Sequence, residues 1–366
     1  MNKVVKFGGS SLASAEQFKK VGEIIRADRE RKFVVPSAPG KRSSDDTKVT
    51  DMLYACYDLA EQGADFTKEM QAIRDRYQEI IDGLGLKLSL DKEFKTIEKN
   101  FKEKAGSDYA ASRGEYLNGI IMAKYLGFSF VDAAEVIRFK ADGEHDAERT
   151  NTLMRDRLST VESAVIPGFY GAYEDGRVKT FSRGGSDITG SIVARAIKAN
   201  VYENWTDVSG VLVADPRIIY KPAGVETITY RELRELAYMG FSVLHEDAIF
   251  PVRSEGIPIN IRNTNAPQDN GTWIVESTRQ FPDQPGRNYR HLRAEPRQSL
   301  RTAQTYRPAA QNHRPASGQV QKQGEPLMTH GALPPAPPTF PPAVPPGPSS
   351  GSHTARPARG DAAACR

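Results

Sequence analysis

Cysteine is scarce in this sequence, which has only Cys56 and Cys365 among its 366 residues. A disulfide framework or a cysteine-based zinc site is therefore not expected, and Cys56 has the helical spacing of a small core residue. No apolar run approaches the roughly 18 residues of a membrane-spanning helix. A signal peptide is not expected either, because no charged start precedes an apolar stretch. These absences predict a cytoplasmic protein with no membrane partner.

An excess of positive charge is lacking from most of the chain. Residues 281–366 hold 16 of the 24 prolines and carry 11 basic against 4 acidic residues, whereas residues 1–280 carry 39 basic and 42 acidic. The isoelectric point of about 8.8 is therefore a property of the tail, and it gives no reason to expect a nucleic-acid partner. The proline-rich runs lack periodicity, so residues 281–366 are expected to be disordered.

Strands and helices alternate through the first 280 residues, which predicts an α/β domain with a largely parallel sheet. Val4–Phe7 is typical of a buried strand, and Ile188 to Ile197 form a clear helical stripe. The polar, lysine-rich residues 83–106 are expected to form a surface excursion. A helix over 109–125 is expected to be interrupted at 112–119. Ligands of such sheets bind at the carboxyl ends of the strands.

Residues suited to chemistry first appear in VVKFGGSS, Val4 to Ser11. A strand that runs into two glycines and a helix is typical of a phosphate cradle, because glycine lets the backbone approach closely and a helix N-terminus offers free N–H donors. Lys6 adds a point charge suited to phosphate oxygens. Alone, the pattern also fits a tight strand–helix turn with a solvated lysine, and it is neither a Walker A loop nor GxGxxG.

A second stretch, TFSRGGSD from Thr180 to Asp187, repeats this layout. An arginine precedes its glycines and an aspartate follows them, so the two loops would hold phosphate oxygens from two sides. A third stretch, WTDVSGVLVADPR from Trp205 to Arg217, places polar groups on a turn between strands. That turn fits either a base or ribose pocket or a well-capped hairpin.

These stretches, in this order, resemble aspartate kinases of the amino acid kinase family. The resemblance covers about residues 2–279 and also rests on SAPGKRSSDDTKVTDML, SRGEYLNG, GFYG, ELAYMGFSVLHEDAIFPV and NTNAPQDNGTWI. It implies the amino acid kinase fold over residues 1–280, a three-layer α/β/α sandwich around a mostly parallel sheet. The implied reaction converts ATP and L-aspartate into ADP and 4-phospho-L-aspartate, the entry step to lysine, threonine and methionine. Mg²⁺ would bridge the phosphates, and a homodimer would be possible.

The resemblance also implies roles for residues by their motif positions. Lys6 would bridge the ATP phosphates, Asp187 would orient Lys6 or the glycine loop, and no residue is expected to hold a metal directly. Glu115 would meet the substrate ammonium and Arg183 its α-carboxylate, where a bidentate fork suits it. The aspartate site would further comprise Ser37, Thr50 and Ser186. Nucleotide contacts would come from Lys6, Gly8, Gly9, Ser10, Gly184, Gly185, Thr206, Asp207 and Arg217.

Several of these residues also have plainer interpretations. Without the motif, Glu115 would be a solvated carboxylate on a polar helix face. Asp187 is equally typical of a helix N-cap, and Thr50 of a residue in a first helical turn. His145 lies in a polar loop and is expected to be solvent-exposed. His245 is expected to be structural, because an acceptor carboxylate with a pKa of about 3.9 needs no general base.

The chain departs from the family pattern in three places. Leu212 stands where a tyrosine is often found, and Ser242 where some members have a lysine. After Gln280 nothing resembles the paired ACT domains that bind lysine or threonine, so the activity is expected to lack feedback control. The tail is interpreted as a shifted reading frame or gene-model error, with a genuine linker or a polyproline ligand as the alternative.

The sequence leaves two other functions open. One is another amino acid kinase, such as a glutamate 5-kinase, which substrate competition would distinguish. The other is a non-catalytic remnant that binds a nucleotide or an amino acid, which an aspartate-dependent assay with MgATP would distinguish.

Overall fold

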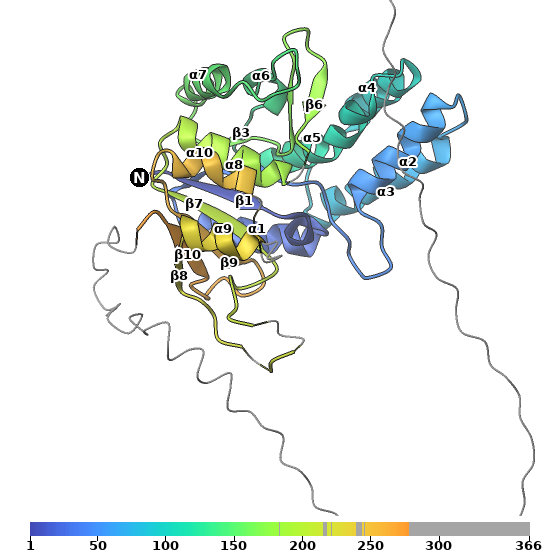
Figure 1. Ribbon diagram of the computed structural model, residues 1–366. Coiled ribbons are helices and arrows are strands. Elements are labelled where there is room, and N and C mark those ends of the chain that lie inside the picture. The colour runs from blue at the N-terminus through green and yellow to red at the C-terminus, as the bar shows by residue number, and fades with distance from the viewer. Residues whose placement is uncertain (183, 215–217, 221, 239–243, 245, 278–366) are drawn as a thin grey trace, which may run out of the picture. The chain divides into compact units, whose positions relative to one another are not determined.

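The computed structural model describes residues 1–277 apart from 183, 215–217, 221, 239–243 and 245, so the tail over 281–366 lies outside the described residues. Its centre is an eight-stranded sheet in the order β3-β4-β2-β1-β7-β9-β10-β8, and β5 and β6 form a separate antiparallel pair (Figure 1). The strands are β1 Lys3–Phe7, β2 Arg31–Pro36, β3 Ser129–Phe130, β4 Ala164–Val165, β5 Tyr170–Ala172, β6 Val178–Thr180, β7 Val201–Thr206, β8 Thr227–Thr229, β9 Ile259–Asn263 and β10 Thr272–Val275. The helices are η1 Gly9–Leu12, α1 Ala15–Arg26, α2 Val49–Glu61, α3 Thr67–Gly83, α4 Asp91–Lys102, α5 Ser107–Leu126, α6 Ala133–Val136, α7 Ala147–Leu158, α8 Gly185–Ala196, α9 Tyr230–Tyr238 and α10 Glu246–Arg253.

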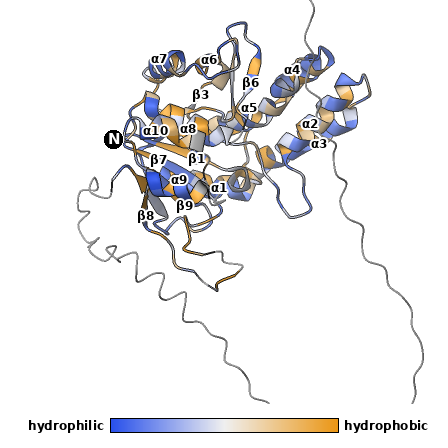
Figure 2. Ribbon diagram, in the orientation of Figure 1, coloured by the Kyte–Doolittle hydropathy of each residue, from blue (hydrophilic) through white to orange (hydrophobic). Residues whose placement is uncertain are grey.

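Both faces of the sheet are covered by helices. Successive residues of a strand point to opposite faces, and Val4 accordingly packs with α6 to α10 whereas Val5 packs with α1 to α5. Figure 2 shows both apolar and polar colours on the helices around the sheet, as expected for helices that bury one face and expose the other. The predicted three-layer α/β/α sandwich is confirmed.

The direction of the strands places several loops at one edge of the sheet. In the order of the sheet, β3, β4, β2, β1, β7 and β9 are parallel to one another. Strand β10 is antiparallel to β9, and β8 is parallel to β10. Phe7 at the end of β1 lies opposite Pro36 of β2 and Trp205 of β7. The segments that begin at Gly8, Ser37 and Thr206 therefore leave the sheet side by side.

Two expectations about helices were wrong. Residues 83–106 contain α4, which buries Phe94, Ile97 and Phe101 on one face while its lysines are exposed on the other. Helix α5 runs without interruption through 112–119, because most of its side chains there are buried in the core. Among the described residues, no helix combines the length and the apolar character needed to cross a bilayer.

A buried ion pair joins β2 to β7 on the side of α1. Arg31 donates from Nε to Oε2 of Glu203 over 2.8 Å, and its Nη1 donates to the carbonyl of Ile24 over 2.6 Å. Trp205 donates from Nε1 to the same Glu203 oxygen over 2.9 Å. The guanidinium carbon of Arg31 also lies 5.3 Å from the centre of the Trp205 ring. The carboxylate of Glu203 thus accepts hydrogen bonds from two buried side chains, those of Arg31 and Trp205.

We expect Glu203→Ala to lower the free energy of unfolding by about 3–5 kcal/mol, because it leaves the guanidinium of Arg31 buried without its carboxylate. Urea denaturation followed by far-UV circular dichroism measures the loss. Glu162→Ala is the control, since Glu162 is 88% exposed and lies 3.6 Å from Lys32. The control should change the stability by less than about 1 kcal/mol, and equal losses in the two variants would contradict this account.

Candidate active site

Two loops at the carboxyl edge of the sheet pack backbone against backbone. The N–H of Gly40, in the loop after β2, donates to the carbonyl of Gly9, in the loop after β1, over 2.8 Å. A Cβ on Gly9 would lie 2.9 Å from the carbonyl oxygen of Ala38, and a Cβ on Gly40 would lie 2.7 Å from the carbonyl carbon of Gly9. Only glycine permits so close an approach at both positions, so the glycines are required for the contact between the loops.

Lys6 reaches from β1 to helix α8, across the face of the sheet. Its Nζ lies 2.7 Å from Oδ1 of Asp187, and both side chains are largely buried. Asn204, which lies opposite Lys6 in β7, donates from Nδ2 to the same oxygen over 2.8 Å. A Cβ on Gly8 would lie 3.7 Å from Nζ of Lys6. The ammonium therefore lies between the two glycine loops that the sequence singles out.

The second glycine pair forms the beginning of α8. Gly184 occupies the N-cap position with a φ of 57°, in the left-handed region that favours glycine. The N–H groups of the first turn, from Gly185 to Asp187, have no acceptor within the helix, and they form the positive end of its dipole. The interpretation of Asp187 as an N-cap is wrong, because this residue lies inside the first turn. The N–H of Gly8 is already donated to the carbonyl of Trp205 over 3.0 Å, so this glycine offers close approach and not a free donor.

Glu115 on α5 is a buried carboxyl, 6% exposed, and the interpretation of a solvated carboxylate is wrong. Burial raises the pKa of Glu115 to about 8, although the backbone N–H of Ala38 and the positive charges of Arg113 and Lys6 act in the opposite direction. Its Oε2 is buried and has no hydrogen-bond partner among the described residues. A buried acceptor without a donor is costly, so a ligand that brings a donor or a positive charge would satisfy it.

Ser37 and Thr50 both lie next to the part of α5 that holds Glu115. The carbonyl of Ser37 accepts a hydrogen bond from Nδ2 of Asn118, one helical turn beyond Glu115, over 2.7 Å. The hydroxyl of Thr50 would lie 3.7 Å from a Cβ on Gly114. Thr50 is also the second residue of α2, so the interpretation as a residue of a first helical turn is confirmed.

The remaining predicted residues fall into two groups. Ser186 is buried against the loop after β4, where a Cβ on Gly168 would lie 2.5 Å from its hydroxyl oxygen. Thr206 ends β7 and donates to Oδ1 of Asp207 over 3.2 Å. A bridge between Leu212 and Gly224 stands where a second strand was expected. Ser10 is exposed on η1. The predicted positions outside the described residues are Arg183, Arg217, Ser242 and His245.

Arg76 on α3 joins the segment after η1 to the loop that contains Gly40. Nothing in the sequence marked it as a site residue. Its Nη2 donates to the carbonyls of Ala13 and Gly40 over 2.9 and 2.8 Å, and its Nη1 donates to Oδ2 of Asp46 over 2.8 Å. The whole residue is only 4% exposed. One guanidinium therefore fixes the chain after η1 to the chain after β2.

Asn204 and Asn118 were also missed. A polar residue within the buried strand VYENWT was the available signal for Asn204, and Asn118 lies in the SRGEYLNG stretch that had already been noted. No group of three or more His, Cys, Asp or Glu side chains in the described part of the chain is arranged to hold a metal ion. The site therefore combines the backbone donors of α8 with Lys6, the buried Glu115 and two carboxamides, those of Asn118 and Asn204.

A site of this kind at the carboxyl edge of a parallel sheet is suited to a phosphorylated ligand. The chain belongs to the amino acid kinase family, which matches it over residues 1–263. Within that family it resembles aspartokinases. It is 40% identical to aspartokinase 3 of Bacillus subtilis over 288 residues, which cover 75% of this chain and 63% of the relative.

Solved structures agree with this assignment. The aspartate kinase of Clostridium acetobutylicum is 52% identical, with a TM-score of 0.73 over 76% of this chain and 64% of the other. Aspartokinase III of Escherichia coli, in complex with aspartate and ADP, is 25% identical, with a TM-score of 0.66 over 76% of this chain and 65% of the other. The chain thus spans somewhat less than two thirds of the length of these relatives.

We expect Glu115→Gln to stabilise the unliganded protein increasingly as the pH rises. The carboxyl ionises near 4.5 when the chain is unfolded and near 8 when it is folded, so the wild type loses stability through that pH window. Gln remains neutral and loses nothing. The difference in the free energy of unfolding should grow by about 3 kcal/mol from pH 5 to pH 8. Urea denaturation at both pH values tests this, with the exposed Glu103→Gln as control, and a pH-independent difference would contradict it.

We expect Arg76→Lys to loosen the loop that contains Gly40, because one ammonium cannot reach the two carbonyls and the carboxylate together. Amide hydrogen exchange of residues 37–48 should accelerate about tenfold or more. Arg74→Lys, on the same helix but paired with Glu98, is the matched control. Unchanged exchange in this loop would show that Arg76 does not hold it.

Proposed function

We propose that this protein is an aspartate kinase, which transfers the γ-phosphoryl group of MgATP to the side-chain carboxylate of L-aspartate. The observation that carries the proposal is the position of Lys6, which lies 2.7 Å from Asp187 between the two glycine loops. The aspartokinase relatives support it, and so does the likeness to the Escherichia coli enzyme, whose structure is a complex with aspartate and ADP. We assign the activity to residues 1–280 and its location to the cytoplasm.

The chemistry requires positioning more than proton transfer. A carboxylate oxygen of aspartate attacks the γ-phosphorus, the bond from that phosphorus to the bridging oxygen of ADP breaks, and the products are 4-phospho-L-aspartate and ADP. The attacking carboxylate is already ionised at neutral pH, since its pKa is about 3.9. The barrier is thus dominated by bringing an anion to a polyanion, which positive charge and N–H donors reduce.

Lys6 and the glycine loops would supply that positive potential. The ammonium of Lys6 has Asp187 as its partner, which orients it in a largely buried place. When MgATP binds, this ammonium would contact the phosphates together with the N–H groups at the start of α8. Magnesium would enter with the nucleotide as part of the substrate. Thr206 and Asp207 lie at the end of β7, next to the loop that begins at Gly8, and they would contact the nucleoside.

Glu115 would recognise the ammonium of aspartate. Its carboxyl has a pKa of about 8 without ligand, and a bound ammonium would favour the ionised form and lower that pKa. Ser37, Thr50 and Ser186 would line the same pocket, and Arg183 would hold the α-carboxylate. Glutamate is longer by one methylene group, and its weaker phosphorylation would distinguish an aspartate kinase from a glutamate 5-kinase.

We expect Lys6→Ala to reduce kcat by about a hundredfold or more, because it removes the positive charge aimed at the phosphates. A hydroxamate-trapping assay with the full chain, L-aspartate and MgATP measures the acyl phosphate directly. Lys32→Ala, on the neighbouring strand β2 and paired with the exposed Glu162, is the control and should retain its activity. Near-normal turnover by Lys6→Ala, or equal turnover with L-glutamate in the wild type, would overturn the proposal.

A further inference from the structure

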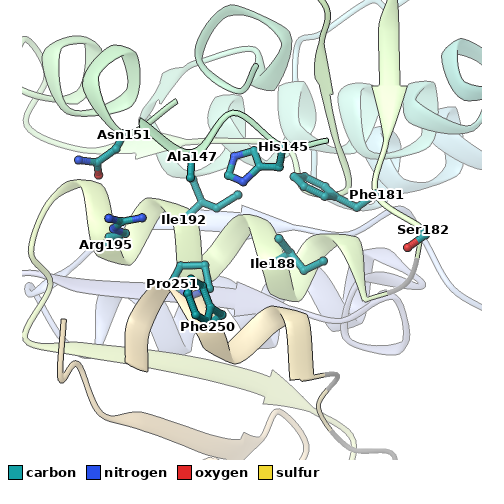
Figure 3. A pocket seen from close by; sticks show the side chains of 10 residues that line it. All are labelled: His145, Ala147, Asn151, Phe181, Ser182, Ile188, Ile192, Arg195, Phe250 and Pro251. Carbon is teal, nitrogen blue, oxygen red and sulfur yellow. The ribbon is translucent and has the colours of Figure 1, made fainter. Parts of the chain in front are cut away.

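A cavity lies on the side of α8 that faces α7 and α10. It has a volume of about 310 Å³, within the range of small-molecule sites. Figure 3 shows side chains from α7, α8, α10 and the end of β6 around it. Ile188, Ile192 and Arg195 are spaced by four and three residues, so they share one face of α8. Lys6 and Asp187 are not among the lining residues, so their ion pair does not border this cavity.

Most of the cavity wall is apolar. Ile188 and Ile192 form one side, and Phe181 lies at one end (Figure 3). Phe250 on α10 is 70% exposed, which is unusual for so large an apolar side chain, and it borders the opening. An apolar group that entered the cavity would remove part of this ring from water.

Two polar side chains lie at the other end of the cavity, Arg195 and Asn151 (Figure 3). Arg195 donates from Nε to Oε1 of Glu255 over 3.4 Å, and its two terminal nitrogens have no partner among the described residues. The side-chain oxygen of Asn151 is buried and also lacks a hydrogen-bond partner there. The two terminal nitrogens of a guanidinium are suited to a carboxylate, and an unpaired amide oxygen is suited to an N–H or O–H donor.

Arg195 is the charged side chain of the described wall, and its partner Glu255 is not among the lining residues. No Asp or Glu lines it, and His145 is the other titratable group besides Arg195 among the described residues of the wall. His145 was expected to be exposed but is half-buried, and its Nε2 lies 3.1 Å from Oγ1 of Thr150. Burial lowers the pKa of His145 to about 4, so its ring is neutral. Arg195 thus supplies the positive charge of this wall.

We propose that this cavity binds a small α-substituted carboxylic acid with an apolar side chain. The carboxylate would pair with Arg195, the α-hydroxyl or α-amino group would donate to Asn151, and the side chain would lie between Ile188, Ile192 and Phe250. This site is independent of the proposed kinase activity, because none of these residues contacts Lys6 or Glu115.

Isothermal titration calorimetry of the full chain at pH 7.5 tests the proposal with 3-phenyl-L-lactate as probe. We expect saturable binding with a dissociation constant of about 1 mM or tighter. L-Phenylalanine carries an α-amino group in place of the α-hydroxyl. Comparing its dissociation constant with that of phenyllactate shows which of the two donors the site prefers. 3-Phenylpropionate lacks the donor and should bind roughly fivefold more weakly, and 2-phenylethanol lacks the carboxylate and should not bind.

Matched variants separate the roles of the two polar side chains. Arg195→Met should weaken the binding of phenyllactate about tenfold or more, whereas Arg149→Met, on the exposed side of α7, should leave it unchanged. Asn151→Leu should abolish the preference for phenyllactate over phenylpropionate. Glu255→Gln releases Arg195 from its partner and should preserve or tighten binding. Lys6→Ala should retain binding, which separates this site from the kinase site.

Several results would overturn the proposal. They are the absence of saturable heat at concentrations about tenfold above the expected dissociation constant, equal binding of 2-phenylethanol, and unchanged affinity in Arg195→Met. Circular dichroism verifies that each variant is folded. If Arg195→Met fails to fold, the loss of preference in Asn151→Leu decides the question.

Discussion

The ion pair between Lys6 and Asp187 is the contact on which the candidate site depends. A largely buried ammonium is costly unless it is paired, and here one carboxylate oxygen accepts from both Lys6 and Asn204. The pair joins the end of β1 to the first turn of α8, two segments about 180 residues apart in the chain. It therefore fixes where the two glycine loops stand relative to each other, and a phosphorylated ligand placed between them meets donors that are already oriented.

A large part of this arrangement was predictable from local pattern. Strand β1, helix α8 and the two glycine pairs have strong signals, because apolar periodicity and glycine position are both set by the neighbouring residues. The parallel sheet then brings Gly8, Ser37 and Thr206 to one edge. The resemblance to the amino acid kinase family added Glu115, whose burial no helical periodicity would have indicated.

The contacts that the sequence did not predict are the ones made across long separations. Arg76 contacts Ala13 and Gly40 from a helix with no motif, so its role depends on how α3 packs. The many lysines of α4 led to the prediction of a surface excursion, because the apolar face of this helix has only three large residues. His145 was placed in a polar loop, yet the rings of Phe139 and Phe181 lie against it. In each case the tertiary environment, and not the neighbouring sequence, decides the outcome.

The reversal of strand direction at β10 has a consequence for the topology of the domain. Val4 lies in register with Tyr202, Tyr202 with Ile259, and Ile259 with Ile274. The start of β1 and the end of β10 therefore lie at the same edge of the sheet, three strand spacings or about 15 Å apart. That edge is opposite the one that holds the glycine loops. A short linker would close the domain into a ring there, and new ends opened in the turn at Gly63 would yield a circular permutant whose ligand-binding edge is untouched.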